Sequence, residues 1–118
     1  NKKEGCRRED EVGKELEDRY PESEGYKVIK EAYLRDKDGN IVRDPEPPYK
    51  ARRIDFVVVK DGKVVDSIEV TSKTAPKEAQ SAKEERIREN GGNYIKDPDT
   101  GELIRIPDSV HTRIERRE

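Results

Sequence analysis

The chain has 118 residues, the length of a single domain, and no shift in composition along it indicates a second one. Charged residues make up 46% of the chain and apolar residues only 29%, so any hydrophobic core has to be small. The net charge of -2 argues against a histone-like protein that coats nucleic acid. The single cysteine excludes an internal disulfide, and no apolar run is long enough for a signal peptide or a membrane span. If the domain crosses a membrane, we expect a larger protein to deliver it.

The first helix is predicted after a polar start. Residues 1–10 are predicted to be frayed or disordered, and residues 11–118 to form the folded domain. Beyond Glu11, apolar residues recur every four positions up to Pro21, which predicts a helix with one buried stripe. The recurring residues are Val12, Leu16 and Tyr20.

Strand and turn signals follow this helix. Residues 26–34 alternate in polarity as a half-buried strand does. The Asp-Gly-Asn run at residues 38–40 predicts a turn, with a short return strand at residues 41–42. Three prolines within residues 44–49 predict an irregular loop.

The centre of the chain is predicted to be a β-hairpin. Two β-rich runs, residues 54–59 and 64–70, flank an Asp61-Gly62 pair, which is a strong hairpin signal. With a two-residue loop, Asp55 and Glu69 would lie on opposite faces of the sheet. Each face would then carry a carboxylate among apolar side chains, which wastes burial.

A three-residue loop with Gly62 as a left-handed bulge pairs Val59 with Lys63 and separates the two kinds of side chain. The core face then collects Ile54, Phe56, Val58, Val64, Ile68 and Val70, with only Asp66 out of place. The other face collects Asp55, Val57, Val59, Val65, Ser67, Glu69, Thr71 and Lys73. Because burial favours this register, we predict that Asp55 and Glu69 share one face.

The second half of the chain predicts a helix, a hairpin and an edge strand. Residues 74–90 read as a helix with Pro76 near its start and two glycines past its end. Its inward residues are predicted to be Ala79, Ala82 and Ile87. Residues 93–96 and 103–106 flank a turn, and residues 110–115 are a candidate edge strand. The order of elements indicates an α/β or α+β fold with a central mixed β-sheet and flanking helices.

The pair Asp55 and Glu69 is the strongest candidate for chemistry. Two carboxylates that converge on one face repel each other unless a divalent cation lies between them, so the pair predicts a site for Mg²⁺ or Mn²⁺, with Zn²⁺ as an alternative. Such a metal polarises a phosphodiester and activates water, and a nearby lysine can stabilise the charge that develops. The alternative for each acid is a residue at a strand edge or in a salt bridge.

The order of these features resembles the restriction-endonuclease-like PD-(D/E)xK nucleases, in which a helical Glu, a strand Asp and a Glu in the next strand precede a second helix. The chain is most similar to the nuclease toxin domains at the C-terminus of bacterial contact-dependent growth inhibition and other polymorphic toxin proteins. The similar motifs are Arg-Ile-Asp-Phe-Val, Glu-Val-Thr-Ser and Gly-Gly-Asn-Tyr-Ile-Lys-Asp-Pro-Asp-Thr-Gly-Glu-Leu. The resemblance spans residues 11–115 and implies a restriction-endonuclease-like core.

The resemblance implies roles for particular residues. Asp55 and Glu69 would bind the metal. Glu11, with Glu15 as its substitute, would be the helical acid, although ordinary surface charge explains a helical Glu equally well. The family's lysine falls at Thr71, so either Lys73 or the hydroxyls of Thr71 and Ser72 would take its role. Substrate contacts are expected from Arg53, Ser72, Gln80 and Lys83, within a wider basic set of Lys50, Arg52, Arg53, Lys73, Lys77 and Lys83.

The implied function is a metal-dependent endonuclease toxin used in interbacterial competition, with RNA, especially tRNA, preferred over DNA as the substrate. A cognate immunity protein would be its partner, and it would be delivered from the surface or secreted by one bacterium to act in the cytoplasm of another. One alternative is a non-catalytic interaction or immunity-like module of the same fold. Another is a metal-independent RNase that rests on His111, the only histidine.

Overall fold

The structure is a computed structural model that describes residues 2–117, with side chains from residue 7 onward; Asn1 and the side chain of Cys6 lie outside this description. Within it, two α-helices, a 3-10 helix and a six-stranded mixed sheet confirm the predicted α+β fold with a central mixed sheet and flanking helices. The helices are α1 (Lys2–Arg19), η1 (Glu22–Glu24) and α2 (Glu78–Glu89). The strands are β1 (Tyr26–Tyr33), β2 (Arg53–Lys60), β3 (Lys63–Thr71), β4 (Tyr94–Lys96), β5 (Leu103–Arg105) and β6 (Arg113–Arg116).

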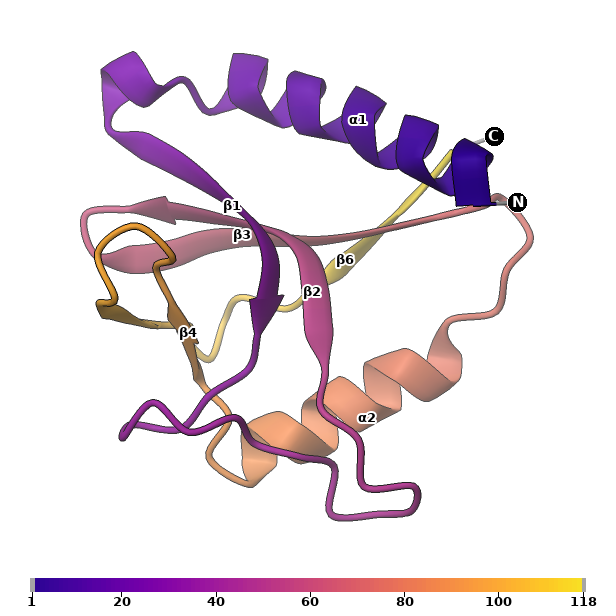
Figure 1. The fold of residues 1–118 in the computed structure, drawn as a ribbon, viewed down its shortest axis with the longest axis vertical. Helices are drawn as coiled ribbons and strands as arrows, with labels where there is room; N and C mark the ends of the chain where they lie inside the picture. Colours follow the sequence, from indigo (N-terminus) through magenta and orange to yellow (C-terminus); the bar gives the residue numbers. More distant parts are fainter. Residues whose placement is uncertain (1, 118) are drawn as a thin grey trace.

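The sheet has the strand order β1-β2-β3-β5-β4, and β6 pairs with β3 outside this path. Strand β3 pairs in parallel with β5 at Lys63, the first residue of β3. It pairs in parallel with β6 along its last four residues, from Ile68 to Thr71. A bridge between Arg35 and Tyr94 joins the chain after β1 to β4. The sheet therefore curls back on itself, and β4 lies below the β2–β3 pair in Figure 1.

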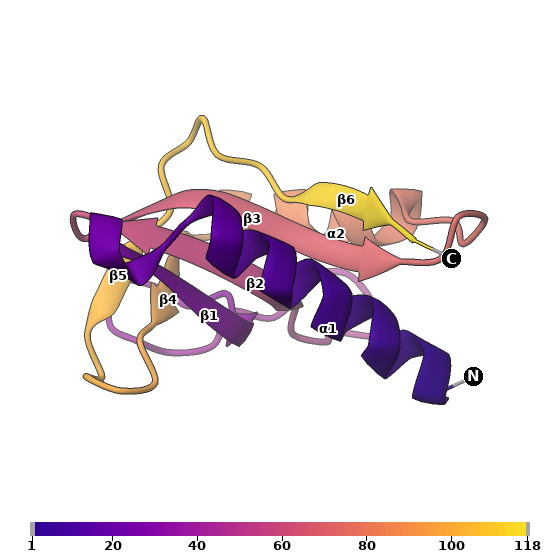
Figure 2. The same ribbon diagram turned by 90° about the horizontal axis from the view of Figure 1, so that it is seen from above.

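Both faces of β2 and β3 are buried. Helix α1 covers one face, where its Val12 and Leu16 pack against four strand residues (Figures 1 and 2). Those residues are Phe56, Val58, Ile68 and Val70. The opposite face lies inside the curled sheet and is closed by α2, whose Ile87 is fully buried there. The apolar stripe predicted for the first helix is confirmed, but α1 begins at Lys2, so residues 2–10 are helical rather than frayed.

The loop of the central hairpin differs from the predicted one. Val59 pairs with Val64 and Lys60 with Lys63, so the loop consists of two residues. Both of them have positive φ, +54° at Asp61 and +75° at Gly62, as a type I′ turn requires. The prediction of a three-residue loop is therefore wrong.

A β-bulge in β3 nevertheless keeps the two faces distinct. Val58 pairs with Asp66 and Val59 with Val64, so the extra residue, Val65, has no partner and is 43% exposed. The bulge moves Val64 into the cluster that contains Val59, and not onto the face predicted for it. Beyond the bulge, Phe56, Val58, Ile68 and Val70 lie on the predicted face, because one extra residue compensates for the shorter loop. Ile54 does not, because it packs in the cluster of Val59 and Val64.

Other elements depart from their predicted bounds. Helix α2 starts at Glu78, after Pro76, because a proline restricts the residue before it and cannot donate a backbone hydrogen bond. Its Ala79 and Ala82 are exposed, and its buried residues are Glu84 and Ile87. The predicted return strand at residues 41–42 is only an isolated bridge. The hairpin β4–β5 and the strand β6 are confirmed.

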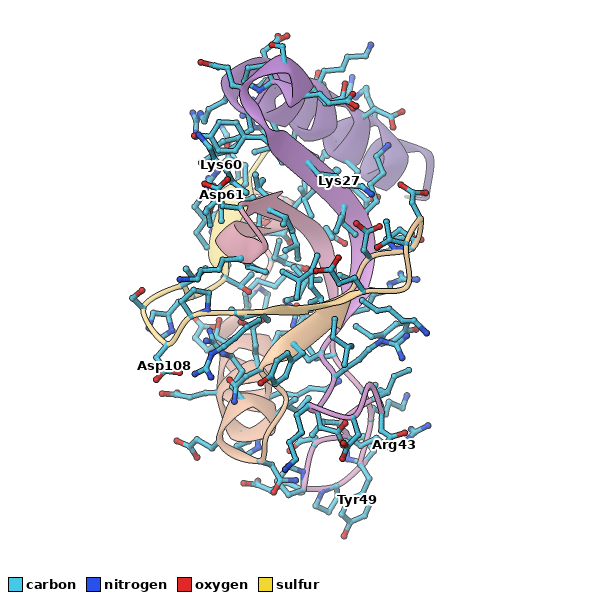
Figure 3. All side chains as sticks on the ribbon, turned by 90° about the vertical axis from the view of Figure 1, so that its left-hand side faces the viewer. Lys27, Arg43, Tyr49, Lys60, Asp61 and Asp108 are labelled. Atoms are coloured by element: carbon cyan, nitrogen blue, oxygen red, sulfur yellow. The ribbon has the colours of Figure 1, made fainter. Side chains whose placement is uncertain are left out.

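An ion pair attaches the proline-containing loop to α2. Arg86 donates from Nε to Oδ1 of Asp44 at 2.9 Å and from Nη2 to Oδ2 at 2.7 Å. Figure 3 shows this loop, with Arg43 and Tyr49, at the end of the molecule that α2 occupies. The hydrogen bonds from Arg86 lower the pKa of Asp44 from 3.8 to about 2.

The pairing predicts a pH dependence for Asp44→Asn. The pKa of Asp44 is lowered in the folded state. Asp44 therefore contributes to stability above pH 3.8, and this contribution is lost as the pH falls to about 2. The free energy of unfolding of the variant, measured in urea, should be lower than that of the wild type near neutral pH, and the difference should shrink as the solution is acidified. Glu46→Gln is the control, because Glu46 is 63% exposed and 3.4 Å from Arg86. A difference that does not change with pH would contradict this assignment.

Candidate functional site

Asp55 lies where β2 and β3 stop pairing. The last pair of their ladder is Phe56 with Ile68, and Asp55 is the next residue of β2. Regular pairing would direct the Val70 amide toward the backbone at Ile54. The amide instead donates to Oδ2 of Asp55 at 2.9 Å, so this carboxylate fills the gap where the strands separate.

Glu69 lies beside it on β3 and is 8% exposed. Its Oε1 accepts a hydrogen bond from Nη2 of Arg52 at 3.2 Å, and its Oε2 lies 3.7 Å from Nζ of Lys77. Burial raises the pKa of Glu69, Arg52 opposes that increase, and the negative charge of Asp55 raises it further. The two predicted carboxylates are therefore close enough to repel each other.

Arg52 joins Glu69 to α2. Its Nε also donates to Oε1 of Glu84 at 3.2 Å, and the side chains of all three residues are exposed by 10% or less. Glu84 precedes Ile87 by three positions and so shares the buried side of α2. The search for apolar periodicity missed Glu84 because it takes only apolar residues as signs of burial, whereas this acid is buried through its pairing with Arg52.

The acid that α1 brings toward Asp55 is Glu9. Glu9 precedes Val12 by three positions and is half-buried, whereas Glu11, the predicted helical acid, is exposed. Burial raises the pKa of Glu9 most, and the negative charge of Asp55 is the next largest cause of the increase. The spacing to Val12 could have indicated Glu9, but residues 1–10 were predicted to be frayed.

Three residues after Glu69 are the candidates for the lysine role, and two of them make hydrogen bonds with the backbone. Thr71 is buried, and its carbonyl accepts a hydrogen bond from the amide of Arg117 at 2.9 Å. The hydroxyl of Ser72 accepts one from the amide of Ala75 at 3.2 Å. Lys73 is exposed and follows the end of β3. The lysine whose contact with Glu69 is given is Lys77, with Nζ 3.7 Å from Oε2.

The predicted substrate-binding residues are spread over the molecule. Oε1 of Gln80 accepts a hydrogen bond from Nζ of Lys77 at 3.3 Å, which places it at the candidate site. Lys83 is half-buried, and its pKa is lowered by burial and by the charge of Arg52. Arg53 has 51% of its side chain exposed and lies 3.9 Å from Glu31 on β1, away from Lys77.

A cavity of about 430 Å³ lies between α2, β3 and the segment that joins β5 to β6. Glu69, Lys77 and Gln80 line it. His111, on which the alternative of a metal-independent RNase rests, lines the same cavity. Asp55 does not line it, so the cavity meets only one of the two acids.

The two acids by themselves would supply only part of a metal site. Among the described residues, no group of three or more His, Cys, Asp and Glu side chains is arranged to hold a metal ion. Mg²⁺ is commonly bound through one or two carboxylates, with water and substrate phosphate as the other ligands. Two carboxylates, Asp55 and Glu69, therefore suit Mg²⁺ better than they suit Zn²⁺, because Zn²⁺ takes three or four protein ligands.

Comparison of the chain with protein families, with curated proteins and with solved structures found no match. None of the helices in residues 2–117 is long and apolar enough to cross a membrane.

The buried charges predict a large effect for Arg52→Leu. This change removes the guanidinium that pairs with both buried acids, Glu69 and Glu84, which should lower the free energy of unfolding by about 3–5 kcal/mol. Urea denaturation near neutral pH measures it. Adding Glu69→Gln and Glu84→Gln to the variant should restore much of the loss.

The matched control is Arg105→Leu. Arg105 and Asp108 lie 3.6 Å apart with side chains 57% and 88% exposed, so this pair should contribute about 1 kcal/mol or less. Equal effects of the two arginine substitutions would contradict the assignment of Arg52 as the central buried charge.

Proposed function

We propose that this domain hydrolyses phosphodiester bonds of nucleic acids as a metal-dependent endonuclease toxin of the restriction-endonuclease-like kind. The observation that supports this most is the position of Asp55 and Glu69 on adjacent strands, where Oδ2 of Asp55 accepts a hydrogen bond at 2.9 Å from the amide of Val70, the residue after Glu69. Glu9 adds a third acid on the α1 side of Asp55, and Lys77 adds a cation at the cavity. Paired acids with a lysine beside a cavity are the groups that such hydrolysis needs.

Asp55 and Glu69 would hold Mg²⁺ or Mn²⁺, and a bound ion of this kind supplies charge neutralisation and a more acidic water. Lys77 would turn from Glu69 to a non-bridging phosphate oxygen when substrate enters, and Gln80 would hold the ammonium group in that position. Arg52 opposes the rise in the pKa of Glu69 and holds its Oε1 by a hydrogen bond. The water oxygen would bond to phosphorus and release one proton to solvent, while the bond to the leaving oxygen breaks and that oxygen takes a proton from solvent.

The biological part of the proposal rests on the sequence resemblance. RNA, especially tRNA, is the proposed substrate ahead of DNA. The proposed setting is competition between bacteria, in which the domain is delivered to a target cell, acts in its cytoplasm and is neutralised by an immunity protein. Two of the motifs that carry this resemblance contain Asp55 and Glu69. Substitution of these two acids therefore tests the proposed enzymatic activity directly.

A cleavage assay tests the metal site. Purified domain is incubated with tRNA and with plasmid DNA in Mg²⁺, Mn²⁺ or EDTA. We expect cleavage that EDTA abolishes, and a loss of about 100-fold or more in Asp55→Asn and Glu69→Gln, because each removes several kcal/mol of transition-state stabilisation. Glu11→Gln is the matched control and should keep wild-type activity. Cleavage that survives EDTA and both acid substitutions would refute the metal site.

The position of the cations predicts different effects for two lysines. Lys77→Ala should slow cleavage by about 100-fold, as expected for a positioned cation that stabilises charge on the phosphate. Lys73→Ala should have little effect, since Lys73 is exposed beyond the end of β3. Circular dichroism checks that both variants fold. The opposite order of effects would return the catalytic role to Lys73.

A metal-independent RNase is the second candidate, because Glu69 and His111 line one cavity and could act as base and acid. It predicts cleavage of RNA that is unaffected by EDTA and lost in His111→Ala. Absence of cleavage under every condition would instead favour a non-catalytic interaction module.

A further inference from the structure

The cavity beside Glu69 extends beyond the groups that hydrolysis would use. Its far end is formed by the segment between β5 and β6, which passes beside α2; Figure 3 labels Asp108 on it. His111, Thr112 and Ile114 line this end together with Asn93 from the chain after α2. Lys77 and Gln80 line the cavity near Glu69, whereas the far end offers the polar side chains of His111, Thr112 and Asn93 and the apolar Ile114, with Arg88 and Asp108 also in its lining.

This far end is held in place from both sides. Arg88 of α2 donates from Nη2 to the carbonyl of Pro107 at 2.9 Å and from Nη1 to the carbonyl of Val110. The hydroxyls of Thr112 and Ser67 share a hydrogen bond of 2.6 Å. His111 lies between the anchored residues Val110 and Thr112, is exposed, and lines the cavity.

The size and charge of the cavity limit what it can hold. About 430 Å³ is within the usual range of small-ligand pockets and accommodates one nucleotide, not a stacked pair of bases. The rim carries exposed acids that repel further phosphates, namely Glu85, Glu89 and Asp108. A base in a duplex is covered on both faces, so only an unstacked base could enter.

We infer that the cavity takes a single unpaired nucleotide, with its phosphate at Lys77 and Gln80 and its base and sugar against His111 and Asn93. This inference rests on the proposed function for the identity of the ligand, and it restricts the substrate to single-stranded or extruded segments. His111 is a binding residue in this arrangement, and it contacts the base by stacking or by a ring hydrogen bond.

Because His111 is the only histidine, its ring protons give an NMR signal that needs no assignment. The wild-type domain in EDTA is titrated with a six-nucleotide single-stranded RNA of mixed sequence, with the blunt duplex of the same strand, and with inorganic phosphate. We expect a saturable shift of the His111 signal with the single strand and no comparable shift with the duplex or with phosphate. His111→Ala should weaken binding of the single strand about tenfold.

Ser109→Ala is the matched control, because Ser109 is an exposed residue of the same segment and does not line the cavity. No shift with the single strand, equal shifts with duplex or phosphate, or unchanged affinity of His111→Ala would overturn the inference. Binding in EDTA does not require hydrolysis. A saturable shift without cleavage would therefore refute the proposed activity and retain the nucleotide pocket, whereas cleavage without the shift would do the reverse.

Discussion

One extra residue in β3 decides which side chains meet at the candidate site. The type I′ turn at Asp61-Gly62 pairs Val59 with Val64, and this register alone would place Asp55 and Glu69 on opposite faces. The bulge at Val65 shifts the pairing by one position before the site is reached. A two-residue turn is therefore compatible with two acids on one face, because the extra residue that shifts the pairing lies in the strand and not in the loop.

Burial of charge is the second constraint on this small protein. With 46% charged residues, the chain has too few apolar side chains to fill the space between α2 and the sheet. Arg52 fills it by bridging Glu69 and Glu84 at 3.2 Å each. Such a cluster adds little net stability over an apolar core, but loss of one member is costly. In the proposed enzyme the same arginine opposes the rise in the pKa of Glu69 and lines the cavity beside it.

The candidate site depends on every layer of the fold. Helix α1 brings Glu9 toward Asp55 from one face of the sheet, and the chain leading into α2 brings Lys77 to Glu69 on the other. The segment before β6 adds His111 on the far side of the cavity. Asp55, in the gap where β2 and β3 separate, is the residue that links the two faces.

Local patterns in the sequence determined much of the fold. The stripe of Val12 and Leu16, the hairpin at Asp61-Gly62 and the β4–β5 hairpin depend on neighbouring residues, and all three are confirmed. Only the tertiary structure decided the bulge and the partners of the buried charges. Arg52 and Glu84 are 32 residues apart in the chain, and pairs that distant leave no periodic signal. Apolar periodicity reports which residues avoid water. The positions of Lys77, Glu9 and His111 at the candidate site instead depend on how separate elements pack together.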